Sequence, residues 1–118
     1  MRRKAGTLVP LELAICTAAA DFRRQGIDEF HGYLIAKELK EHADNRLLTA
    51  YGTLYRALGR LESMGLLASR WEDAMVAADE NRPRRRFYSL TPAGEEAVAE
   101  AVRAAAEKAG PKKGWASA

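Results

Sequence analysis

The sequence predicts a mainly α-helical fold with a β-hairpin, arranged as a winged helix-turn-helix domain plus a C-terminal dimerisation helix. Apolar side chains recur every three or four residues in four stretches of the chain, which is the spacing of one helix face. Between the third and fourth stretches lie two runs with strand character, 66–72 and 85–90. Two helices joined by a short polar turn and followed by a hairpin are typical of this fold.

Length and composition favour one small globular domain. The chain has 118 residues, of which 47% are hydrophobic and 30% charged, so we expect a soluble protein and not a disordered one. No apolar run is long enough to cross a bilayer, and the basic start leads directly into helical pattern, so neither a membrane segment nor a secretory signal is expected. Cys16 is the single cysteine, which excludes an internal disulfide and favours a cytoplasmic location.

The first helix is expected to follow a flexible basic arm, residues 1–7, and to run from Leu8 to Gln25. Gly26 provides the stop. Cys16 is expected to behave as a small core side chain. The predicted buried side of the helix comprises Leu8, Leu11, Ile15, Ala18, Ala19 and Phe22.

The second helix is predicted within 31–43, because Leu34, Ile35 and Leu39 have helical spacing. A polar turn at 44–46 ends it. His31 and His42 are eleven positions apart and share no helix face, so we place them near the helix ends and expect no metal site.

The third helix, 49–63, is the element around which the chain is organised. Thr49 is the expected N-cap, Leu54, Leu58 and Leu61 form a buried stripe, and Gly65 marks the end. Such a stripe opposite a polar, cationic face fits a DNA major groove, although an ordinary amphipathic surface helix is the alternative. The opposite face carries Tyr51, Thr53, Arg56, Ala57 and Arg60.

The hairpin is distinguished by its arginines. A connection of about ten residues, from Asp73 to Arg82, is predicted as a long loop. The net charge of +3 discriminates little, but arginines crowd onto the returning limb, as expected where a protein contacts phosphate or the minor groove. Solvated arginines are the alternative. Trp71 is expected to pack. The cluster comprises Arg82, Arg84, Arg85 and Arg86.

The last helix begins with a strong start signal. Thr91 is a cap, Pro92 takes the first helical position, and the helix is expected to end before Gly110, with a disordered tail at 111–118. Its apolar stripe has nothing after it in sequence to cover it, which favours a dimer over a helix folded back on the first helix. The predicted dimer interface comprises Leu11, Ile15, Val98, Ala101, Val102 and Ala105.

Three segments together resemble the PadR family of bacterial transcriptional regulators: HGYLIAKEL, GTLYRALGRLESMGLL and RRRFYSLTPAG, in this order and spacing. The resemblance runs from about Leu8 to the last helix, and the single final helix is similar to the smaller PadR-like proteins. It implies a homodimeric repressor that binds inverted repeats in double-stranded DNA and is often released by a small-molecule effector. By position, it implies DNA contacts from Thr49, Tyr51, Gly52, Thr53, Tyr55, Arg56, Arg84, Arg85 and Arg86.

The sequence departs from the family pattern at two places. Ala50 stands where the family often has serine or threonine, and the final helix lacks the tryptophan that holds flat aromatic drugs in some small relatives, so such a pore is not expected. An effector site would lie between the first and last helices, lined by Leu11, Ile15 and Val98.

Two other function classes compete with a DNA-binding regulator. A winged helix that binds proteins without reading DNA sequence is the alternative, since arginine is also favoured in protein interfaces. An enzyme is not expected, because the sequence holds no nucleophile–base pair, no phosphate-binding glycine loop and no metal or cofactor set.

Overall fold

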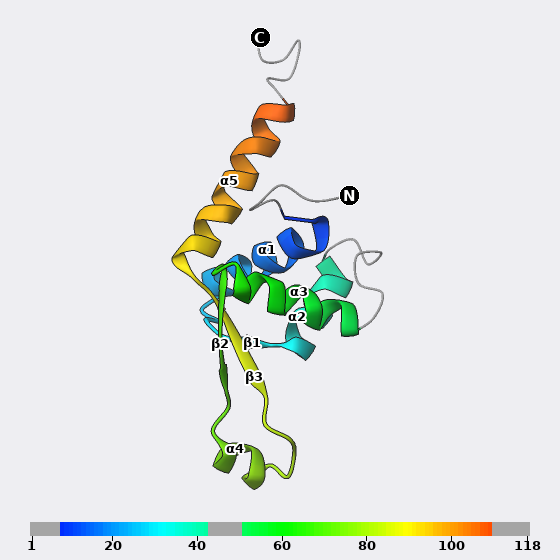
Figure 1. Ribbon diagram of the computed structural model, residues 1–118, viewed down its shortest axis with the longest axis vertical. Helices are drawn as coiled ribbons and strands as arrows, with labels where there is room; N and C mark the ends of the chain where they lie inside the picture. Colours follow the sequence, from blue (N-terminus) through cyan, green and yellow to red (C-terminus); the bar gives the residue numbers. More distant parts are fainter. Residues whose placement is uncertain (1–7, 43–50, 110–118) are drawn as a thin grey trace.

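The computed structural model describes residues 8–42 and 51–109, and it confirms a mainly helical fold with a small antiparallel sheet (Figure 1). The predicted arm, the 44–46 turn, the Thr49 cap and the tail lie outside the described residues. The elements in order are α1 (Pro10–Arg24), β1 (Phe30–His31), α2 (Gly32–His42), α3 (Tyr51–Ser63), β2 (Leu67–Trp71), α4 (Ala74–Asp79), β3 (Arg86–Leu90) and α5 (Pro92–Ala109).

The core lies where α1, α2 and α3 meet. The predicted stripes close on one another, with Ile15, Leu39 and Leu58 fully buried among them. Fully burying a side chain of this size stabilises the fold by about 1.5–3 kcal/mol. The sheet joins the same core through Phe30 and Tyr88, whose ring centroids lie 6.1 Å apart.

The sheet has one strand more than the sequence predicts. Its order is β1-β3-β2, and both pairings are antiparallel. Phe30 pairs with Tyr88 and His31 with Phe87, at the point where the sequence predicts the second helix to begin and no strand. Two residues are too short to show alternation. His31 immediately precedes α2, and its Nδ1 accepts a hydrogen bond from the Leu34 amide in the first turn of that helix at 3.4 Å.

The connection between β2 and β3 is not the long loop that the sequence predicts. It contains α4, a short helix in an alanine-rich run, which Asp73 caps by accepting a hydrogen bond from the Met75 amide at 2.8 Å. We call β2, α4 and β3 together the wing. Its tip is the helix α4, which lies at the far end of the molecule from α5 (Figure 1).

The start of α5 is attached to the end of α3. The Thr91 hydroxyl donates a hydrogen bond to the Gly65 carbonyl at 2.6 Å and accepts one from the Gly94 amide at 3.0 Å, which confirms Thr91 as the cap. Gly65 has φ +79°, a conformation that glycine adopts without strain. A Cβ at position 94 would overlap the Leu66 carbonyl, so only glycine allows this close packing.

Within the described residues, the first half of α5 makes the main contacts with the rest of the chain. It lies along α1, where Arg23 and Glu95 form an ion pair at 3.0 Å and Val98 is packed against the core. Beyond Ala101 the helix extends past the body (Figure 1), and Val102 is 63% exposed. The first half of the stripe therefore folds back on α1, as in the alternative interpretation. The second half is exposed, and its role in a dimer stays a prediction.

Candidate nucleic-acid interface

The outer face of α3 presents most of the residues that were predicted to contact DNA. Tyr51, Gly52, Tyr55 and Arg56 are exposed, whereas Thr53 is half-buried and its Oγ1 accepts a hydrogen bond from Arg56 Nη2 at 3.4 Å. These side chains occupy the first two turns of the helix, where helix-turn-helix proteins contact base edges.

Two residues assigned to this outer face have structural roles. Ala57 is only 8% exposed and belongs to the core. Arg60 Nε lies 2.9 Å from Glu12 Oε2, and Glu12 is 2% exposed on α1. The buried carboxylate also accepts a hydrogen bond from the Val9 amide at 3.1 Å. Arg60 therefore ties α3 to α1.

Tyr55 lies against the start of α2. A Cβ on Gly32 would overlap the Tyr55 hydroxyl and ring, so the absence of a side chain at position 32 lets the tyrosine lie against this helix end. Tyr55 nevertheless keeps about half of its surface exposed, at 49%.

The wing presents two exposed arginines and a half-buried one. Arg84 and Arg85 are exposed, and Arg86 is half-buried, with Nη2 3.7 Å from Glu62 Oε2. The guanidinium groups of Arg84 and Arg86 lie 5.8 and 5.0 Å from the centroid of the Trp71 ring. Trp71, which was expected to pack, is 53% exposed and forms a platform for these cations.

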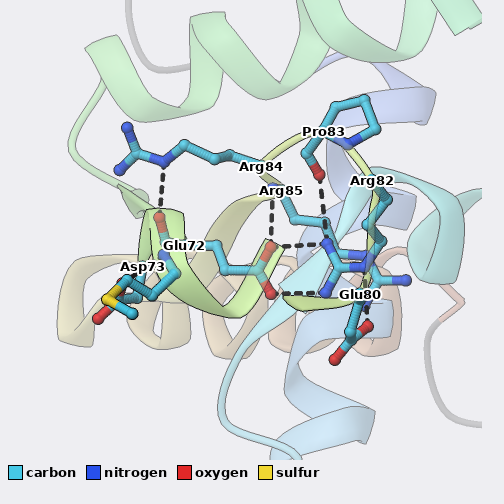
Figure 2. A network of polar contacts seen from close by, with 8 residues as sticks. Glu72, Asp73, Glu80, Arg82, Pro83, Arg84 and Arg85 are labelled. Carbon is cyan, nitrogen blue, oxygen red and sulfur yellow. Dashed lines mark hydrogen bonds and ion pairs between the residues drawn. The ribbon is translucent and has the colours of Figure 1, made fainter. Parts of the chain in front are cut away.

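Arg82 is committed to a network at the base of the wing tip (Figure 2). Its Nη1 and Nη2 donate to the two carboxylate oxygens of Glu72 at 2.7 and 2.8 Å, and its Nε donates to Glu80 at 2.9 Å. The Arg85 amide donates to Glu72 Oε1 at 3.2 Å, and Arg84 Nε donates to the Glu72 carbonyl at 2.8 Å. Glu72 is buried, and the hydrogen bonds that its carboxylate accepts, first from the Arg82 side chain and then from the Arg85 amide, lower its pKa to about 2.

A hollow of about 530 Å³ separates α3 from the wing and brings part of the predicted site together. Tyr55 and the wing arginines 84–86 line it, while Tyr51, Gly52 and Arg56 lie outside it on α3. His31 and Tyr33, which the sequence did not single out for binding, also line it. Burial, followed by the charges of Arg85 and Arg82, lowers the pKa of His31, so the hollow favours the neutral imidazole.

The predicted dimer residues fall into two groups. Leu11 and Ile15 point into the core of their own chain, and Ile15 is 0% exposed, so they do not form a surface for a second copy. Apolar periodicity identified their buried side but not the neighbour that buries it. Val98 and Ala101 are half-buried, and Val102 and Ala105 are exposed.

Two other kinds of site are absent from residues 8–42 and 51–109. No group of three histidine, cysteine or acidic side chains could hold a metal ion within these ranges. No helix in the same ranges is both long and apolar enough to span a membrane.

Comparison with known proteins identifies the family. The model of the transcriptional regulator PadR-like family matches residues 26–100. The transcriptional regulator Rv3488 of Mycobacterium tuberculosis is 40% identical over 82 residues, which cover 70% of this chain and 68% of that protein.

Solved structures agree with this assignment. A PadR family transcription regulator from Clostridium difficile has a TM-score of 0.62 at 25% identity, covering 79% of this chain and 83% of its own. A PadR-like transcription factor from Bacteroides fragilis has a TM-score of 0.62 at 29% identity, covering 80% and 78%.

The family match spans α2, α3, the wing and the first half of α5, which are the elements that carry the exposed tyrosines and arginines. The resemblance seen in the sequence motifs is therefore confirmed. The chain belongs to the PadR-like family of transcriptional regulators, which act by binding DNA and are not enzymes.

Proposed function

We propose that this regulator is a homodimeric repressor that binds an inverted-repeat operator. The observation that carries the proposal is the exposed face of α3, where Tyr51 and Arg56 point outward while the leucine stripe is buried. In a two-fold dimer, the two α3 helices would enter successive major grooves about 34–36 Å apart.

The contacts divide between base edges and phosphate. Tyr51, Thr53 and Arg56 lie in the first two turns of α3 and are assigned to the bases, with Gly52 allowing close approach of the backbone. Arg84 and Arg85 on the wing are assigned to the phosphates, which position the protein without reading sequence.

The returning limb of the wing, residues 82–86, is assigned to the DNA, and the tip of the wing at α4 is not. The tip carries exposed acidic side chains, Asp73, Asp79 and Glu80, around α4. Carboxylates are repelled by the phosphate backbone, whereas the arginines that follow are attracted to it. The wing of this protein therefore contacts the backbone beside the recognition helix and keeps its tip outside the groove.

Dimerisation is assigned to the second half of α5. Val102 and Ala105 are exposed on a helix that extends beyond the body of its own chain (Figure 1). Small side chains let a second helix approach closely and bury this stripe. The two chains would then be joined through the helices that follow each wing.

A small-molecule effector is assigned to the groove between α1 and α5. The groove measures about 410 Å³ and is lined by Ala20, Arg24, Val98 and Val102 among others. It borders the proposed dimer interface, so a ligand bound there could change the angle between subunits. A regulator of this kind would act in the bacterial cytoplasm, where the chromosome lies.

The test is selection of bound duplexes from a random pool, followed by footprinting of the selected sequence. We expect a two-fold symmetric sequence with half-sites about 10 base pairs apart, and repression of a reporter placed behind it. Enrichment of no sequence would contradict the proposal and favour a winged helix that serves protein interaction.

A further inference from the structure

We propose that Glu72 is a positioning residue for DNA binding: an acid on the wing that strengthens the protein's hold on a polyanion. The proposal rests on the assignment of Arg84 and Arg85 to phosphate. By charge alone, an acid on the DNA-binding side should weaken binding, because it repels the backbone. The hydrogen bonds of Glu72 indicate the opposite effect.

The first step is the number of limb residues that Glu72 holds. Its carboxylate accepts hydrogen bonds from both terminal nitrogens of Arg82, at 2.7 and 2.8 Å, and from the Arg85 amide, at 3.2 Å. Its backbone accepts Arg84 Nε at 2.8 Å and donates to the Arg85 carbonyl at 2.8 Å. One residue thus fixes three arginines of the returning limb (Figure 2).

The second step is what these bonds leave available. Arg82 is used as a structural cation, since its fork is filled by the Glu72 carboxylate and its Nε by Glu80. Arg84 donates to the Glu72 carbonyl through Nε, so its two terminal nitrogens take no part in this bond and can donate to a phosphate. Arg85 is held through its backbone, which leaves its exposed guanidinium able to bind phosphate.

The third step is the conformation of the limb. Residues 82–85 precede β3, and Glu72 immediately follows β2, so the ladder between the strands ends where the Glu72 bonds begin. These bonds continue the hairpin toward α4, and loss of those made by the Glu72 carboxylate would leave residues 82–85 less firmly held. An arginine that is ordered in advance loses less conformational entropy when it binds phosphate than a free one does.

The test compares Glu72→Gln with Asp79→Asn in the full-length protein. Both substitutions remove one negative charge from the wing, but Asp79 is exposed on α4 and lies outside the network. Dissociation constants are measured as a function of salt, on the selected duplex and on an unrelated duplex of equal length.

We expect Glu72→Gln to bind roughly tenfold more weakly and to flatten the slope of log K against log salt by about 0.9 for each phosphate that is no longer neutralised. Asp79→Asn should keep the parental slope and bind equally well or more tightly. A variant that merely unfolds in part would reduce the amount of active protein without changing the slope. Circular dichroism checks the fold.

A second readout reports directly on the limb. In a Trp115→Phe background, Trp71 is the single tryptophan of the chain. We expect Glu72→Gln to increase quenching of Trp71 by acrylamide, because loss of the carboxylate bonds to Arg82 and the Arg85 amide would loosen the segment that carries Arg84 over the Trp71 ring.

Parental slope, parental or tighter binding and unchanged quenching in Glu72→Gln would overturn the positioning role. Failure of the parent protein to prefer any duplex would instead overturn the proposed operator function. The slope on the unrelated duplex would still decide the role of Glu72 in that case.

Discussion

Arg60 on α3 is joined to Glu12 on α1 across 2.9 Å, so one of the cations predicted on the outer face of α3 instead holds this helix in the fold. We expect Arg60→Ala to lower the free energy of unfolding by about 1–3 kcal/mol, since it removes a hydrogen bond to a buried charge and Arg60 itself is partly exposed. Urea unfolding followed by circular dichroism measures the change.

Arg56, one turn earlier on the exposed face, is the matched control for that substitution. Arg56→Ala should change stability by no more than about 0.5 kcal/mol and should weaken DNA binding. Equal stability losses in the two variants would contradict the division of α3 into a structural and a DNA-facing cation.

The wing arginines should act without regard to sequence. We expect Arg85→Ala to weaken binding to selected and unrelated duplexes alike, and to reduce the salt slope by about 0.9, because one phosphate is no longer neutralised. Titrations at several salt concentrations measure the slope. The control is Lys108→Ala, which removes a cation in the last turn of α5 and should leave the slope unchanged.

The first turn of α3 should act on sequence preference instead. We expect Tyr51→Ala to reduce the difference in binding free energy between selected and unrelated duplexes by about 1–3 kcal/mol, the size of one interaction with a base edge. Repeating the duplex selection with the variant would show which position is relaxed. A proportional loss on all duplexes would mean that Tyr51 binds the backbone.

The dimer assignment predicts a change of mass. We expect Val102→Glu to convert a particle of twice 13.0 kDa into one of 13.0 kDa in light scattering, because a charge would be buried between the two helices. Val76→Glu, the same substitution on exposed α4, is the control and should keep the mass of the parent. A parent that is already monomeric would refute the interface.

Cys16 predicts a dependence of stability on alkaline pH. Burial, and then the charge of Glu12, raises the pKa of this thiol from 9.0 to about 11. The unfolded chain releases the proton first, so the contribution of Cys16 to stability is complete below pH 9 and declines as the pH approaches 11. Urea unfolding at about pH 8 and about pH 10.5, on either side of the unfolded value, should show a loss that Cys16→Ala reduces.

The sequence predicted those features that depend on neighbouring residues. Thr91 and Gly65 are local signals, and both elements begin or end where these residues indicate. β1 was missed because two residues show no periodicity, and α4 because its alanines were read as part of a long connection. In both cases the element is too short to produce a pattern.

The sequence predicted which types of residue form the candidate site. It did not predict which arginines form ion pairs with acidic residues of the same chain. The outward tyrosines of α3 follow from the leucine stripe. Whether an arginine faces DNA depends on acids far away in sequence, and Arg60 and Arg82 are occupied by Glu12 and Glu72. Tertiary ion pairs of this kind leave no periodic signal, so a charge cluster overstates the number of available cations.

The bond between Thr91 and Gly65 has a mechanical consequence. It joins the start of α5 to the short turn, Met64 and Gly65, that follows α3. An 18-residue helix is about 27 Å long, so tilting it by about 10° at this joint displaces its far end by about 5 Å. In the proposed dimer, two such helices would be joined at their far ends. A small change in the angle between them would then alter the distance between the two α3 helices, and with it the fit to two half-sites at a fixed spacing.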